Sequence, residues 1–321
     1  MADGDLTLAD LGEFGLIEKV TAVIAATAPG EDVLVGPGDD AALLRVRRGH
    51  VVVSSDLFVE GRHFRKEWVD AVDVGHRAAA QNLADIAAMG GRARWLTIGL
   101  AAPADLPVQW AVDFAKGFAE EAASVGAGVV GGDVTASDRV TIAVTVIGEC
   151  LVAPVLRGGA AAGDVVALTG RQGWAAGGLA VLGRGFRSPR VLVEAYRRPE
   201  PPYAAGPVAA DAGATAMIDV SDGLLADAAH IAEASGVAID IDSSAFDVPE
   251  PLVAVGQAIG ADPMRFILGG GDDHALLATY STAADVPDGW TVIGRVIAPS
   301  DGAQVTVDGS TYDGPTGWTH F

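Results

Sequence analysis

The stretch VVVSSDLFVEGRHF, residues 51–64, is the part of the chain from which the rest can be interpreted. Val51–Val53 has the composition of a strand interior, because β-branched residues fit a pleated surface. Ser54, Ser55 and Asp56 follow directly, so we expect two hydroxyl groups and a carboxylate at the end of a strand. Open α/β sheets bind ligands at the carboxyl ends of their strands. Oxygen ligands of this kind suit Mg²⁺ better than zinc, although the stretch alone is also typical of a strand followed by a polar turn.

The composition indicates a large apolar core inside a strongly acidic chain. The 321 residues are 50% hydrophobic, which is sufficient for two domains. There are 42 acidic residues against 21 basic ones, and the net charge of −21 argues against partners that are nucleic acids or anionic membranes. Cys150 is the only cysteine, which excludes an intrachain disulfide and disfavours a thiolate zinc site. Without a signal pattern or an apolar run of about 20 residues, we expect a cytoplasmic protein.

Strand-like and helix-like patterns alternate along the whole chain, which predicts an α/β or α+β fold. Helices are expected over residues 14–24, 72–89 and 108–124, and strands over residues 33–35, 51–55, 95–100 and 140–147. After Cys150 the sequence becomes glycine-rich before a new strand at residues 165–169. We therefore expect two domains, residues 1–149 and residues 150–321.

Acidic residues recur at predicted strand ends, on one helix face and in glycine-flanked turns. Each of them alone is typical of a turn. Gathered at one edge of a sheet, such carboxylates would repel one another unless cations neutralised them. A site with several Mg²⁺ ions is the simplest explanation, and such sites usually handle polyphosphates. The residues are Asp39, Asp40, Asp56, Asp85, Asp133, Asp219, Asp222, Asp272 and Asp273.

Other nucleotide-binding and catalytic patterns fit the chain less well. There are three lysines and none follows a glycine, so the chain has no P-loop. The sequence DVSDG, residues 219–223, lies at a predicted strand–turn–helix junction, which is also the context of a serine nucleophile elbow. Two carboxylates beside Ser221 disfavour that role. A simpler alternative makes Ser221 or Asp222 the N-cap of the next helix.

Several segments, in this order, resemble one known family. They are GDDAALL (38–44), SSDLFVEGRHF (54–64), NLADIAAMG (82–90), GGD (131–133), RRPEPP (197–202), IDVSDGLLADAAHIA (218–232), GGGDDHALL (269–277) and GWTHF (317–321). Together they cover nearly the whole chain. By these segments the chain resembles the bacterial thiamine-monophosphate kinases, in the superfamily that also holds aminoimidazole ribonucleotide synthetase and selenophosphate synthetase.

The resemblance implies a two-domain aminoimidazole ribonucleotide synthetase-like fold. The N-terminal domain would bind ATP and metal and pair into a barrel at a homodimer interface. The C-terminal domain, a mixed sheet with helices, would close the cleft. The implied reaction is ATP-dependent phosphorylation of thiamine monophosphate to thiamine diphosphate, by direct in-line transfer assisted by several Mg²⁺ ions.

The resemblance also assigns roles to individual residues. The implied Mg²⁺ ligands are Asp40, Ser54, Ser55, Asp56, Asp85, Asp133, Asp219 and Asp222, of which Asp56, Asp133 and Asp222 would be catalytic. The implied nucleotide contacts are Gly132, Asp133, Arg157 and Ser221. The implied contacts to thiamine monophosphate are His63, Asp272 and Trp318. Asp272 stands where the family has glutamate, and Ala84 stands where the family has serine.

The chemistry of the acceptor agrees with an acidic, lysine-poor site. A phosphate monoester has a second pKa of about 6, so the acceptor is already an anion at neutral pH and needs no general base. The barrier is repulsion between two polyanions, which bound cations relieve. The alternatives that remain open are another ATP-dependent enzyme of the superfamily, a serine hydrolase that uses Ser221, and a non-catalytic metal- or nucleotide-binding protein.

Overall fold

The structure is a computed structural model, and it describes residues 6–25, 31–35, 42–46, 49–299 and 304–318. Two compact units divide the chain. The first comprises Met1–Ile86 and Arg92–Leu151, and the second comprises Ala87–Gly91 and Val152–Phe321. Each unit has its own sheet and its own core, so each is described by itself.

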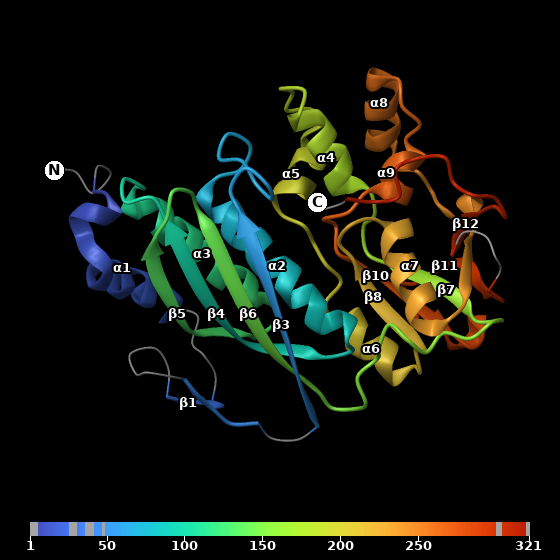
Figure 1. Cartoon of the computed structure of the whole chain (residues 1–321), viewed down its shortest axis with the longest axis horizontal. Helices are drawn as coiled ribbons and strands as arrows, with labels where there is room; N and C mark the ends of the chain where they lie inside the picture. The colour runs from blue at the N-terminus through green and yellow to red at the C-terminus, as the bar shows by residue number, and fades with distance from the viewer. Residues whose placement is uncertain (1–5, 26–30, 36–41, 47–48, 300–303, 319–321) are drawn as a thin grey trace. The chain divides into compact units, whose positions relative to one another are not determined.

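The first unit is built on a four-stranded sheet (Figure 1). The strand order is β3-β6-β4-β5, and only β4 and β5 are parallel to each other. A separate two-stranded sheet joins β1 to β2. The strands are β1 (Val33–Val35), β2 (Leu43–Leu44), β3 (His50–Val59), β4 (Arg92–Ala102), β5 (Gly128–Ala136) and β6 (Thr141–Cys150).

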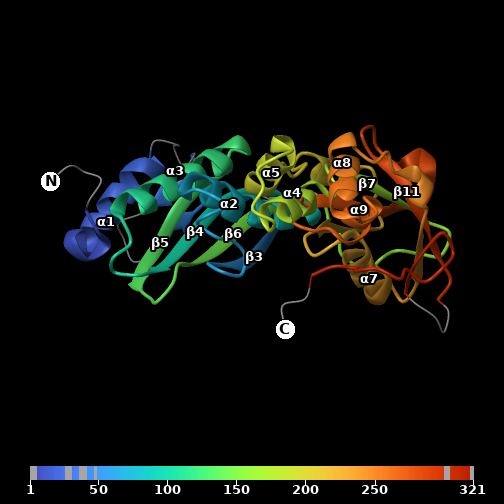
Figure 2. The same ribbon diagram turned by 90° about the horizontal axis from the view of Figure 1, so that it is seen from above.

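Helices cover one face of this sheet, as Figure 2 shows from above. They are α1 (Leu8–Ala25), α2 (Ala71–Ala88) and α3 (Val108–Ser124), at the positions where the apolar spacing predicts them. Two glycines let α2 and α3 approach closely, because a Cβ on Gly75 would meet the carbonyl oxygen of Phe114 and a Cβ on Gly117 would meet that of Val72. The other face carries no helix among the described residues, and Val51, Val53 and Leu57 of β3 are 47%, 62% and 59% exposed on it. We call it the open face.

Two strands run further than the sequence predicts. Ser54, Ser55 and Asp56 were expected at a strand end, but they lie inside the ten-residue β3. Asp133 was expected in a glycine turn, but it lies inside β5. Both expectations were wrong. Serine, aspartate and glycine have a low intrinsic preference for strands, but the surrounding sheet can outweigh that preference. Pairing along the whole length of β6 or β4 fixes these residues as strand.

The second unit is built on a six-stranded mixed sheet of order β12-β9-β11-β7-β10-β8. Only the pair β12 and β9 is parallel. The strands are β7 (Val165–Thr169), β8 (Ala216–Val220), β9 (Ala238–Ile241), β10 (Ala275–Tyr280), β11 (Thr291–Ile297) and β12 (Val305–Val307).

The main core of the second unit lies between this sheet and α7, whose Leu224, Ala228 and Ile231 are fully buried there. A smaller cluster around Met217 and Tyr280 occupies the other face of the sheet, against α6. The helices are α4 (Trp174–Leu182), α5 (Arg190–Arg197), α6 (Ala205–Asp211), α7 (Leu224–Ser235), α8 (Glu250–Ile259) and α9 (Met264–Gly269), with short 3₁₀ turns η2 (Ser243–Ala245) and η3 (Ala283–Asp285). No helix within the described residues combines the length and the apolar character that crossing a membrane requires.

Candidate active site

The helix-covered face of the first sheet brings three predicted metal ligands toward one region. Side chains alternate between faces along a strand, so Ser54 and Asp56 point to the same side of β3. Asp85 reaches this side from α2, and Ser54 Oγ donates a hydrogen bond of 2.6 Å to Asp85 Oδ2. One hydroxyl and two carboxylates are therefore offered by β3 and α2 together.

Two other predicted ligands lie on the open face. Ser55 alternates with Ser54 and donates to the carbonyl oxygen of Val144 over 2.8 Å. The row of paired residues that contains Asp133 crosses β4 and β6 and ends at Leu57, which is exposed on the open face. Ser55 and Asp133 thus share a face, but they lie on β3 and β5, the two outer strands of the sheet. Three strand spacings, about 14 Å, separate those strands.

Gly132, directly before Asp133, allows a close approach between strands. A Cβ on Gly132 would meet the carbonyl oxygen of Ile98 on β4. His63 lies in the turn after β3, where its Nδ1 accepts a hydrogen bond of 3.0 Å from the Val59 N–H, and its ring stacks on Phe58 at 5.7 Å.

In the second unit, Asp219 lies on β8 and is paired with a histidine that sequence reasoning missed. His274 Nδ1 and Asp219 Oδ2 are 3.0 Å apart, and both residues are 5% exposed. His274 directly follows Asp272 and Asp273 in the segment GGGDDHALL, and this position beside the acidic pair was the available signal. The imidazole fixes the orientation of the Asp219 carboxylate.

Backbone hydrogen bonds draw four further predicted residues together at the end of β8. The N–H of Asp272 donates to the carbonyl oxygen of Ser221 over 2.9 Å. The N–H of Trp318 donates to the carbonyl oxygen of Asp222 over 3.0 Å. The glycine-rich loop before β10 and the last described residues of the chain are thereby held against the turn Ser221–Gly223, and the Trp318 side chain remains 58% exposed.

This turn is held by a residue that sequence reasoning also missed, Asp227 on α7. Its Oδ2 accepts hydrogen bonds of 3.0 Å from the N–H groups of both Asp222 and Gly223. The N-cap position is Gly223, with no side-chain cap, so the expectation that Ser221 or Asp222 caps the helix was wrong. Burial raises the pKa of Asp227 to about 7, and the nearby charges of Asp219 and Asp222 add to the effect. The sequence feature that could have identified Asp227 is its position as an acidic residue in the first turn of the predicted helix.

The glycine-rich loop is fixed from the side of α4. Gln172 Nε2 donates to the carbonyl oxygens of Ile267 and Gly270 over 2.9 and 2.7 Å. Asp273 Oδ1 accepts from the Ala175 N–H over 2.9 Å at the start of α4, and burial raises the pKa of Asp273 to about 7. Asp272 has φ of 66°, in the left-handed region that aspartate tolerates better than most residues.

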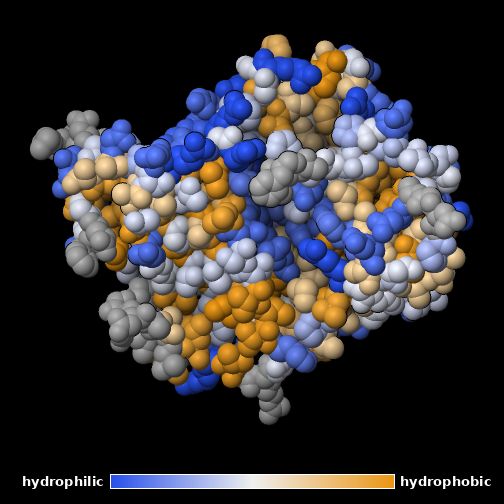
Figure 3. Space-filling view, in the orientation of Figure 1, coloured by the Kyte–Doolittle hydropathy of each residue, from blue (hydrophilic) through white to orange (hydrophobic). Residues whose placement is uncertain are grey.

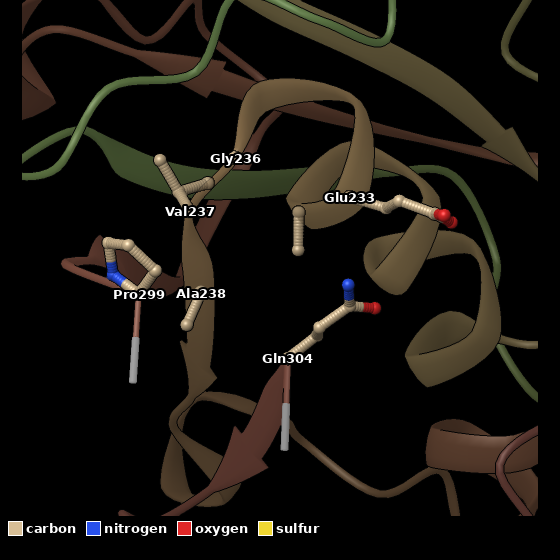
Figure 4. A pocket seen from close by; sticks show the side chains of 7 residues that line it. Glu233, Gly236, Val237, Ala238, Pro299 and Gln304 are labelled. Atoms are coloured by element: carbon tan, nitrogen blue, oxygen red, sulfur yellow. The ribbon is translucent and has the colours of Figure 1, made fainter. Parts of the chain in front are cut away.

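Arg157 lies away from the other predicted nucleotide contact in this unit. Its carbonyl oxygen accepts a hydrogen bond of 3.2 Å from Ser235 Oγ, at the C-terminal end of α7. Ser221 precedes the N-terminal end of the same helix, whose 12 residues span about 18 Å. A pocket of about 200 Å³, lined by Glu233, Val237 and Gln304 among others, also lies at the C-terminal end of α7 (Figure 4). It contains none of the predicted site residues.

The ligand chemistry of the predicted metal residues fits a hard cation. Every donor is a carboxylate or hydroxyl oxygen, and the Ser54–Asp85 contact shows two of them converging. Within the described residues no three histidine, cysteine, aspartate or glutamate side chains gather closely enough to hold an ion by themselves. Asp40, with Asp39, lies outside the described residues. The oxygen donors would therefore have to be completed by a nucleotide, by water or by further protein groups.

Comparison with known proteins defines the class. The family model of the AIR synthase related protein N-terminal domain matches residues 38–150, and that of the C-terminal domain matches residues 161–305. A thiamine-monophosphate kinase of Mycobacterium tuberculosis is 46% identical over 318 residues, which is 98% of this chain and 93% of the relative. One of Corynebacterium glutamicum is 38% identical, over 98% of this chain and 95% of the relative.

Solved structures give the same result. AaThiL complexed with AMPPCP and TMP superposes with a TM-score of 0.80 at 32% identity, covering 98% of this chain and 99% of the other. Thiamine-monophosphate kinase from Stenotrophomonas maltophilia gives a TM-score of 0.78 at 33% identity, over 92% and 96% of the two chains. The chain belongs to the thiamine-monophosphate kinase family of AIR synthase related proteins.

Proposed function

We propose that this chain transfers a phosphoryl group from ATP to thiamine monophosphate and forms thiamine diphosphate. The observation that carries the proposal is the hydrogen bond between Trp318 and Asp222. It seats an exposed indole beside an acidic turn. A tryptophan face attracts the aromatic rings and the cationic thiazolium of thiamine by stacking and cation–π contact. The relatives named for this activity match the chain from end to end.

The oxygen donors that would hold Mg²⁺ are Ser54, Ser55, Asp56, Asp85 and Asp133 in the first unit and Asp219 and Asp222 in the second, with Asp40 as an eighth. When bound, such ions neutralise phosphate charge and hold both phosphates for in-line transfer. The residues of the chain orient these donors. Asp85 accepts from Ser54, and His274 holds the Asp219 carboxylate.

Ser221 would contact the nucleotide without becoming a nucleophile. The phosphate acceptor brings its own anionic oxygen, so neither a serine nucleophile nor a general base is required. This favours direct transfer over the serine hydrolase alternative.

The proposed enzyme is a homodimer that pairs through the open face of its N-terminal units. Val51, Val53 and Leu57 are exposed there, and Figure 3 shows apolar side chains gathered over β3 and β6. Exposed apolar patches of this kind mark association surfaces. Pairing of two such sheets would make the barrel that the family resemblance implies. Val53→Glu together with Leu57→Glu is expected to give a monomer in sedimentation analysis.

Dimerisation would also complete the site. Ser55 and Asp133 share the open face but lie on opposite outer strands, too far apart to bind one ion within a single chain. We therefore propose that Asp133 serves the site that holds Ser55 of the partner subunit. Gly132, next to Asp133, would approach the nucleotide at the same place.

A coupled assay tests the proposed function. ADP release by the purified chain should require both Mg²⁺ and thiamine monophosphate, and mass spectrometry should find thiamine diphosphate. ADP release that is unaffected by thiamine monophosphate but stimulated by another acceptor would indicate a different enzyme of the superfamily. ATP binding without any product would indicate a non-catalytic binding protein. As a consumer of ATP, the enzyme is expected in the cytoplasm.

A further inference from the structure

Both backbone polar groups of Asp222, its N–H and its carbonyl oxygen, are hydrogen-bonded. Its N–H donates to Asp227 Oδ2 over 3.0 Å, and its carbonyl oxygen accepts from the Trp318 N–H over 3.0 Å. The residue that would bind metal is thus linked on one side to α7 and on the other to the segment that would contact thiamine.

The geometry of this turn leaves little freedom for another arrangement. Gly223 has φ of 153°, and a Cβ on it would crowd the carbonyl oxygens of Gly269 and Thr316. The Ala226 N–H donates to the carbonyl oxygen of Thr316 over 3.1 Å. The turn, the first turn of α7 and residues 315–318 therefore pack against one another, and Asp227 is the acidic side chain that accepts the N–H groups of the turn.

Burying the carboxylate of Asp227 is unfavourable, because a charged group is better solvated by water than by the protein interior. Asp227 is 2% exposed, and nearby Asp219 and Asp222 add unfavourable charge. A buried carboxylate is retained where its hydrogen bonds are needed. Here it accepts from two consecutive backbone N–H groups with one oxygen, which is an arrangement that fixes a turn.

We infer that Asp227 is a positioning residue for the metal and thiamine subsites, because it holds the Asp222 turn against the C-terminal segment that carries Trp318. This rests on the proposed function. Asp227 itself is not placed among the metal ligands. Residues that orient ligands from behind typically alter metal affinity by about 10- to 100-fold when they are removed.

The first test measures the turn without any ligand. Hydrogen exchange of the amides of Asp222 and Gly223 is followed by mass spectrometry of peptides over residues 219–226. Asp227→Ala should speed exchange of these two amides roughly 2- to 10-fold, as expected for the loss of one hydrogen bond each. Asp227→Asn keeps an oxygen acceptor and should restore much of the protection. Unchanged exchange in Asp227→Ala would overturn the inference.

The second test measures the Mg²⁺ concentration for half-maximal ADP release in the presence of thiamine monophosphate. Asp227→Ala should raise it about 10- to 100-fold, with the value for Asp227→Asn between wild type and Asp227→Ala. The matched control is Asp164→Ala. Asp164 is 5% exposed and also accepts two hydrogen bonds, from the Ala161 N–H over 3.0 Å and from Thr215 Oγ1 over 2.7 Å, away from the turn.

The control should lower the melting temperature without shifting the Mg²⁺ requirement. An equal shift in the Asp164 and Asp227 variants would mean that Asp227 is merely structural, and overturns the inference. If Asp227→Ala does not fold, Asp227→Glu displaces the acceptor while keeping the charge, and an unchanged Mg²⁺ requirement in it has the same meaning. If the wild type releases no ADP with thiamine monophosphate, the proposed function fails, while the exchange measurement still decides whether Asp227 holds the turn.

Discussion

Trp318 donates its backbone N–H to the carbonyl oxygen of Asp222 over 3.0 Å, and this bond ties the last described residues of the chain to the turn before α7. A terminal segment usually frays unless it is held in this way. Because the backbone makes the bond, the indole is free to serve a different purpose. Its 58% exposure shows that core packing is not that purpose.

Trp318→Ala is therefore expected to raise KM for thiamine monophosphate about 2- to 30-fold, the loss of one stacking or cation–π contact. KM for ATP and the melting temperature should change little, because the substitution keeps the backbone bond. Trp318→Phe, which keeps an aromatic face, is the control and should retain most of the affinity. A fall in melting temperature with both KM values altered alike would instead support a packing role.

Asp56→Asn and Asp133→Asn should each reduce kcat by about 10²- to 10³-fold or more, because each removes a stabiliser of transition-state charge. Circular dichroism should show an unchanged fold. Near-normal turnover of both variants at saturating Mg²⁺ would exclude the metal-site interpretation.

Ser55→Ala and Asp133→Asn test the sharing of sites between subunits. A purified mixed dimer, with Ser55→Ala in one subunit and Asp133→Asn in the other, has one intact site if Asp133 acts in the partner subunit. Its activity should then be about half that of the wild type. If both residues act within one chain, both sites are damaged and the mixed dimer stays as inactive as either variant.

Ser221→Ala should weaken ATP use only moderately, by the roughly 0.5–1.5 kcal/mol of one hydrogen bond. Steady-state kinetics with ATP varied would show this as a change of about 2- to 12-fold in kcat/KM. Loss of all activity, together with a covalently modified serine found by mass spectrometry, would restore the serine hydrolase alternative.

Asp273 predicts a pH dependence of stability. Its pKa is raised from 3.8 to about 7 in the folded state, so folding takes up a proton between these values. The free energy of unfolding that this proton uptake contributes is fully present below 3.8, the pKa of Asp273 in the unfolded chain. It is lost as pH rises to about 7. Asp273→Asn keeps the acceptor for the Ala175 N–H but cannot ionise. Urea unfolding should show Asp273→Asn gaining free energy of unfolding relative to wild type between pH 5 and pH 7.5.

If the free energy of unfolding differs between wild type and Asp273→Asn by the same amount at pH 5 and pH 7.5, the pKa of Asp273 is not raised by burial. Asp273→Ala is a useful second variant, because it also removes the acceptor at the start of α4 and should be less stable than Asp273→Asn at either pH.

The sequence alone was sufficient for the class of fold, the family and most of the elements. The predicted helix over residues 108–124 coincides with α3, and the predicted strand over residues 33–35 coincides with β1. Apolar periodicity carries this information, because a helix or strand must present one face to a core. The acidic segments also identified the turn at residues 219–223 without any contact being known.

Tertiary structure decided how the predicted site residues face. Ser54 and Ser55 point to opposite sides because β3 continues through them, and that continuation depends on pairing with β6. Asp133 lies on the open face because of its register with β4. His274 reaches Asp219, and Asp227 reaches back to Asp222, only once β8, α7 and β10 are assembled. Local propensity acts over a few residues, whereas ladder hydrogen bonds and burial join segments far apart in the chain, and these long-range terms outweighed it here.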